Sequence, residues 1–104
     1  MSDDAPQAGT GVPAGAISKE LLIINKRGLH ARASAKFVQA VERFNAQVWV
    51  TRGGETVGGT SIMGLMMLAA GPGTSITVTA SGTESAEVMA ALEALVGGRF
   101  GEDD

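Results

Sequence analysis

The sequence predicts an α+β protein in which a four-stranded, mainly antiparallel sheet carries three helices on one face. Two apolar patterns support this: short runs or alternations typical of strands, and longer stretches with apolar residues at helical spacing. They follow one another in the order β-α-β-β-α-β-α. A chain of 104 residues without internal repeats fits one domain with one modest core.

The two ends of the chain are expected to lie outside that domain. Residues 1–18 consist largely of Ala, Gly, Pro, Ser, Thr and Asp, which predicts a disordered tail. The domain itself is expected at 19–97. Residues 98–104 are expected to form a short acidic tail, from which Phe100 could pack back onto the domain.

The domain is expected to begin with a strand and a helix. The apolar run at 20–25 suits a strand that is buried on at least one face. Residues 31–44 carry Phe37, Val41 and Phe44 at helical spacing, with basic and polar residues for the opposite face.

A hairpin is expected next. Residues 47–51 alternate, which predicts a strand with its two valines inward and Trp49 on the opposite, open face. The glycines within 52–55 indicate a tight turn, and 56–58 a short return strand.

The remaining elements are a short helix, a strand and a longer helix. Thr60 or Ser61 can cap the short helix, which is expected at 62–69. Strict alternation predicts a strand at 74–80, and 84–96 has the apolar face of an amphipathic helix.

Composition excludes several classes of function. The chain has no cysteine and one histidine, so cysteine-based and histidine-rich metal sites are excluded, and no cofactor is expected. Between Lys19 and Arg99, eight basic residues stand against six acidic ones, a balance too mild for nucleic-acid binding. No apolar run approaches the roughly 20 residues that cross a bilayer. Residues 1–4 are acidic where a signal peptide would be basic, so we expect a cytoplasmic protein without membrane partners.

The single histidine, His30, stands where the first strand gives way to the first helix. A helix N-terminus offers unpaired backbone N–H groups and a partial positive charge, both of which favour phosphate. Imidazole is a competent nucleophile near neutral pH, and Arg32 lies two residues further on. These features favour a phosphorylated histidine over the alternative, an ordinary surface or capping histidine.

Three motifs together resemble the histidine-containing phosphocarrier (HPr) family of the phosphoenolpyruvate:sugar phosphotransferase system. They are Gly-Leu-His-Ala-Arg at 28–32, the helix that runs on to Val38, and Ser-Ile-Met-Gly-Leu-Met at 61–66. The resemblance covers residues 20–96 in the same element order. It implies an HPr-like open-faced β-sandwich, and a carrier, not an enzyme, that accepts a phosphoryl group from enzyme I and passes it to a IIA-type protein.

The resemblance also implies roles for particular residues. His30 would be phosphorylated on Nδ1, and Arg32 would steady the phosphate. Ser61 would match the serine that an HPr kinase/phosphorylase modifies in many bacteria, although helix capping alone would also explain a serine there. Lys36, one turn after Arg32, is either a solvated residue or a docking contact.

The helix at 62–69 has more apolar side chains than one short helix can bury. Leu65 and Leu68 or Ala69 can face the core. This leaves three apolar side chains partly exposed: Ile62, Met63 and Met66. Methionine adapts to varied surfaces, and the resemblance implies that this patch docks partners; a merely well-packed helix is the alternative.

Two positions depart from the family pattern. Many members have proline where this chain has Ala33, and lysine where it has Thr60. The missing proline leaves the first helical turn less preorganised but supplies an extra N–H group. These departures are compatible with the nitrogen-related branch of the system, and the sugar branch stays open.

Two other classes of function compete with the carrier. The first is a regulatory binding protein of the same fold that acts through Ser61 and the apolar patch without relaying phosphate; relatives of that sort lack the histidine. The second is a hydrolase, which the inventory disfavours because every aspartate lies in a tail and no acid is near His30 in sequence. A glutamate could still reach His30 in the fold. A relay presents one face to successive partners, so we expect a monomer.

Overall fold

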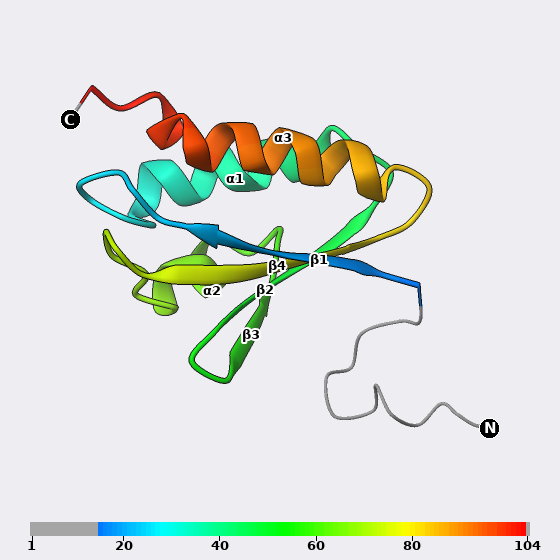
Figure 1. The fold of residues 1–104 in the computed structure, drawn as a ribbon, viewed down its shortest axis with the longest axis horizontal. Helices are drawn as coiled ribbons and strands as arrows, with labels where there is room; N and C mark the ends of the chain where they lie inside the picture. Colours follow the sequence, from blue (N-terminus) through cyan, green and yellow to red (C-terminus); the bar gives the residue numbers. More distant parts are fainter. Residues whose placement is uncertain (1–14, 104) are drawn as a thin grey trace.

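The computed structural model describes residues 15–103, so residues 1–14 of the expected N-terminal tail lie outside it, as does Asp104. The elements occur in the predicted order, followed by one additional 3₁₀ turn (Figure 1). They are β1 (Ile17–Leu22), α1 (Ala31–Glu42), β2 (Gln47–Arg52), β3 (Glu55–Gly58), α2 (Ile62–Met67), β4 (Ser75–Ser81), α3 (Ser85–Gly97) and the 3₁₀ turn Arg99–Gly101.

The four strands form one antiparallel sheet in the order β1-β4-β2-β3, which confirms the predicted fold class. Figure 1 shows α1 and α3 lying side by side over one face of this sheet. In β2, Val48 and Val50 are buried beneath the helices. Trp49 pairs with Thr79 and therefore lies on the open face, as predicted.

The core fills the space between this sheet and the helices. Alternate residues of β4 point into it, and α1 buries Phe37 and Val41 at the predicted helical spacing. Leu65 and Leu68 are the buried residues of the short α2 segment, and α3 contributes Val88, Met89, Leu92 and Val96.

The first strand differs from its predicted range of 20–25. It begins at Ile17 because this residue pairs with β4, so two residues assigned to the tail belong to the sheet. It ends at Leu22, although Ile23 still exchanges two backbone hydrogen bonds with the 73–74 turn. The chain then turns at Asn25, whose side chain donates to the Gly28 carbonyl at 2.8 Å.

Two helices also end earlier than predicted. The first ends at Glu42 instead of residue 44. The helix expected at 62–69 ends at Met67, because Ala69 adopts a left-handed backbone conformation with φ +54° that no α-helix continues.

The acidic tail expected at 98–104 is packed against the domain as far as Glu102. Phe100 is buried, and the 3₁₀ turn folds the chain back so that Lys36 Nζ donates to the Phe100 carbonyl at 2.6 Å. Burial of a phenylalanine side chain stabilises by about 2 kcal/mol or more, and together with the hydrogen bond from Lys36 it anchors this segment to the domain. Among the described residues, no helix is long and apolar enough to cross a membrane.

Candidate functional site

The loop that precedes α1 places His30 at the start of that helix. Gly28 adopts φ +65°, and the next residue, Leu29, is buried and donates its N–H to the Ala70 carbonyl at 3.0 Å. The Ser34 hydroxyl in turn donates to the Leu29 carbonyl at 3.1 Å. The backbone before His30 is therefore held from both sides.

His30 is the N-cap residue of α1. Its backbone is extended, and its carbonyl accepts the first helical hydrogen bond, from Ser34 N–H at 2.8 Å. Its side chain makes no capping hydrogen bond, so the capping alternative does not account for the imidazole. Helical geometry leaves the N–H groups of residues 31–33 outside the hydrogen-bond ladder, and Ala33 contributes one that proline would lack.

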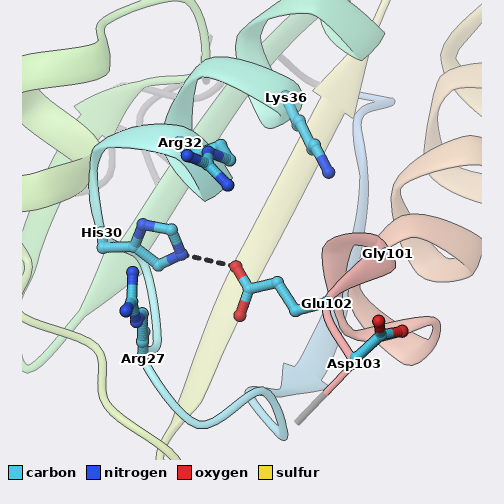
Figure 2. Close-up of a pocket in the computed structure, with 7 residues that line it drawn as sticks. All are labelled: Arg27, His30, Arg32, Lys36, Gly101, Glu102 and Asp103. Atoms are coloured by element: carbon cyan, nitrogen blue, oxygen red, sulfur yellow. Dashed lines mark hydrogen bonds and ion pairs between the residues drawn. The ribbon is translucent and has the colours of Figure 1, made fainter.

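Basic side chains gather around His30. Figure 2 shows a surface pocket that is lined by His30 together with Arg27, Arg32 and Lys36, and closed on the other side by the C-terminal segment. Arg27 was not among the site residues predicted from the sequence. Its position in the loop three residues before His30 was the signal that could have identified it. Arg27 and Arg32 are exposed, whereas Lys36 is half-buried against Phe100.

The carboxylate of Glu102 faces His30, 72 residues away in sequence. Its Oε2 lies 2.5 Å from His30 Nε2, and its Oε1 accepts from Asn25 Nδ2 at 3.1 Å. The hydrogen bond with His30 is the main cause that lowers the pKa of Glu102 below its usual value, with Asn25 and the charge of Arg27 acting in the same direction against partial burial. The sequence allowed for a glutamate that reaches His30 only in the folded chain, and Glu102 is that residue.

Ser61 caps α2. Its hydroxyl accepts from Gly64 N–H at 2.9 Å, so of the two predicted caps it is Ser61 that serves. Ser61 and Thr60 are both exposed. The capping role therefore coexists with an accessible hydroxyl.

The apolar residues of α2 divide as predicted. Leu65 and Leu68 are buried, while the predicted patch is exposed to between 39% and 67%. It consists of Ile62, Met63 and Met66. Met67 is equally exposed and was not predicted to be. Met66 and His30 help to line one shallow pocket, so the patch adjoins the histidine.

Within residues 15–103, no group of three histidine, cysteine, aspartate or glutamate side chains could hold a metal ion. The arrangement around His30 is instead suited to an anion. It combines a nucleophilic ring, three basic side chains and a helix N-terminus, all of which favour a phosphoryl group.

Comparison with known proteins identifies close relatives over the whole domain. The family model described as "PTS HPr component phosphorylation site" matches residues 17–97. The phosphocarrier protein HPr of Neisseria meningitidis serogroup A is 51% identical over 88 residues, which cover 85% of this chain and 99% of the relative. HPr of Cupriavidus necator is 49% identical with the same coverage. A crystal structure of HPr from Thermoanaerobacter tengcongensis matches with a TM-score of 0.80 at 38% identity, covering 85% of this chain and 99% of that one.

Proposed function

Because this chain belongs to the HPr family of the phosphotransferase system, whose members are phosphocarrier proteins and not enzymes, we propose that it carries its phosphoryl group on Nδ1 of His30. The group comes from phosphorylated enzyme I and passes to a IIA-type acceptor protein. The carrier works as a cytoplasmic monomer that presents the same face to both partners.

The observation that carries this proposal is the convergence of basic groups on the chain's single histidine. A phosphoryl group on His30 brings two negative charges into a pocket that Arg27, Arg32 and Lys36 line. Arginine binds phosphate oxygens through two parallel N–H donors, and such charge-assisted hydrogen bonds are short and strong. The N–H groups at the start of α1 add donors to the same region.

The transfer step needs no group outside the two proteins. The lone pair of His30 Nδ1 forms a bond to phosphorus while the bond between phosphorus and the donor atom of enzyme I breaks, and the donor atom keeps that electron pair. The reverse geometry applies when an acceptor side chain attacks the phosphorus on His30. The basic side chains offset negative charge on the phosphoryl oxygens in both steps.

The surface beside the histidine fits successive docking. Ile62, Met63 and Met66 present an adaptable apolar patch next to His30, and we assign partner contact to this patch and to Lys36. Ser61 adjoins the patch and is accessible, so an HPr kinase/phosphorylase could phosphorylate it. Phosphate at a helix N-terminus is tolerated, and its charge would oppose acidic partners at the patch.

The decisive experiment is the intact mass of the full chain after incubation with phosphoenolpyruvate and a matching enzyme I, at neutral to basic pH. One phosphoryl adduct, lost in mild acid and absent in His30→Ala, supports the proposal. No adduct, with that enzyme I active on its own carrier, contradicts it and favours the alternative, a regulatory protein that acts through Ser61 and the patch. Repeating the assay with IIA proteins of the nitrogen-related and sugar branches identifies the acceptor.

A further inference from the structure

We propose that Asn25 and Glu102 are positioning residues for His30: Asn25 holds the Glu102 carboxylate on Nε2, so that Nδ1 keeps the lone pair that attacks phosphorus. This inference rests on the proposed function, because it explains which ring nitrogen becomes the nucleophile. Neither residue would touch the phosphoryl group, so both act through the imidazole.

The first support is the buried amide of Asn25. Its Nδ2 atom donates to two acceptors, the Gly28 carbonyl at 2.8 Å and Glu102 Oε1 at 3.1 Å. Asn25 is fully buried, and its Oδ1 has no hydrogen-bond partner within residues 15–103. An unsatisfied buried oxygen is costly, so a polar residue here calls for a compensating role, and its two donors supply one by joining the loop before His30 to Glu102.

The second support is the anchoring of the segment that carries Glu102. Two residues before it, Phe100 is buried in the core, and the Phe100 carbonyl accepts from Lys36 Nζ. The Glu102 N–H donates to the Arg99 carbonyl at 3.0 Å and closes the 3₁₀ turn. The side chains of Glu102 and His30 are only 16% and 23% exposed. The carboxylate is therefore held against the ring both by its own anchored backbone and by Asn25.

The chemistry of the pair selects one nitrogen. A neutral imidazole has a single N–H group, and an ionised carboxylate can only accept a hydrogen bond. The proton therefore lies on Nε2, against Glu102, and Nδ1 carries the lone pair. Figure 2 shows the second ring nitrogen on the side of the ring where Arg32 lies, away from Glu102.

The carboxylate also fits the charge that develops on the ring. When Nδ1 bonds to phosphorus, both ring nitrogens carry a substituent and the imidazole becomes positive, with its Nε2 proton facing Glu102. A carboxylate in that position stabilises an imidazolium, as the aspartate does in a serine-protease triad. Arg27, Arg32 and Lys36 line the same pocket, together with the acidic Asp103, so Glu102 supplies negative charge where the neighbouring groups are mostly basic.

The test is NMR spectroscopy of the unphosphorylated, isotope-labelled full chain at mildly basic pH. A proton on His30 Nε2 that is hydrogen-bonded to a carboxylate resonates far downfield and exchanges slowly with water. We expect this resonance in the parent chain and in Asp103→Asn, which removes one negative charge from the same segment. In Glu102→Gln and Asn25→Leu its exchange should accelerate at least about tenfold, by analogy with the lower end of what losing the outer partner of a metal-bound histidine costs.

A second readout follows Glu102 itself. The carboxyl carbon of Glu102 should titrate at a higher pH in Asn25→Leu than in the parent chain, because one of its donors is gone. A resonance that survives unchanged in Glu102→Gln, or that is lost equally in Asp103→Asn, overturns the inference. An unchanged exchange rate and titration in Asn25→Leu removes Asn25 from it.

The outcome is independent of the phosphorylation assay. If His30 takes up phosphate but the Nε2 resonance is unchanged in Glu102→Gln or is lost equally in Asp103→Asn, only the positioning role fails. If the resonance behaves as expected but His30 takes up no phosphate, the proposed function fails. Where both hold, Glu102→Gln should slow phosphoryl acceptance about tenfold, whereas Glu87→Gln, a charge removal on the exposed face of α3, should not.

Discussion

The α-carbon of Gly28 lies so close to the Ala70 carbonyl that a β-carbon added to Gly28 would stand 2.2 Å from that oxygen. The same carbonyl accepts the Leu29 N–H, and Gly28 itself adopts φ +65°. Close approach and left-handed backbone both require glycine here. The contact seats the loop that delivers His30 to the helix N-terminus.

Gly28→Ala should therefore unfold more easily and accept phosphate more slowly. A left-handed conformation costs an alanine about 1–2 kcal/mol, and relieving the clash with Ala70 moves the backbone beside His30. Gly53→Ala is the matched control, because Gly53 has φ +59° but a β-carbon added there would meet no atom within 4 Å. Urea unfolding should show a loss of about 1 kcal/mol for the control and clearly more for Gly28→Ala. Equal losses would contradict the role of the contact.

Arg32→Ala should slow phosphoryl acceptance and shorten the lifetime of the phosphohistidine. The exposed guanidinium lines the pocket beside His30, and a charge-assisted hydrogen bond is worth about 1.5–3 kcal/mol. That range corresponds to roughly 10- to 150-fold in rate. Rapid-quench transfer from phosphorylated enzyme I measures it. Arg43→Ala, an exposed arginine at the other end of α1, should stay near the parent rate; a similar loss there would indicate general electrostatics.

Ser61→Ala should destabilise the chain by about 1 kcal/mol, because the hydrogen bond from Gly64 N–H to the Ser61 hydroxyl is lost. Thr60→Ala, at an exposed neighbour that does not cap the helix, should change the free energy of unfolding by less than about 0.5 kcal/mol. Thermal unfolding of the two variants side by side measures the difference. Indistinguishable midpoints would show that the cap contributes nothing.

Met63→Gln should weaken binding to enzyme I without weakening the fold. Met63 is 67% exposed, so its substitution should change the free energy of unfolding by less than about 0.5 kcal/mol. A contributing interface side chain is worth about 1 kcal/mol, or roughly fivefold in Kd. Leu22→Gln offers a comparison, since Leu22 is 53% exposed on the open face of the sheet, where no docking is proposed. If calorimetry finds the larger loss of affinity in Leu22→Gln, the binding interface lies on the open face of the sheet and not at the α2 patch.

Much of the fold could be predicted because its signals are local. The alternation in β4 and the helical spacing of Phe37 and Val41 in α1 depend only on neighbours in sequence, and the apolar side chains of both elements are buried as expected. The ends of the elements were harder to predict. The pairing of Ile17 with Ala80 and the left-handed turn at Ala69 are set by contacts made after the chain has folded.

The site was predictable only where its residues adjoin one another in sequence. His30 and Arg32 could be placed together because the start of a helix fixes both. Glu102 could not, because it reaches His30 across 72 residues through a turn in which Arg99 and Phe100 have positive φ, a conformation that sequence patterns for these residues do not indicate. An apolar Phe100 within an acidic tail was the one signal that this end of the chain packs back.

The contact between His30 and Glu102 predicts a particular pH dependence of stability. The pKa of Glu102 lies below its usual 4.5 in the folded chain, chiefly through the hydrogen bond with His30. The unfolded chain therefore binds more protons between the two values, so the stability contributed by Glu102 is complete above about pH 5 and is lost as pH falls through the folded pKa. The difference in unfolding free energy between the parent chain and Glu102→Gln isolates this contribution, because all other carboxylates are common to both. Urea titrations at successive pH values below about 5, the range in which Glu102 itself takes up its proton, should show the parent's advantage shrinking on acidification. An advantage that stays constant or grows on acidification within this range would mean that the Glu102 carboxylate is not held on His30 in solution.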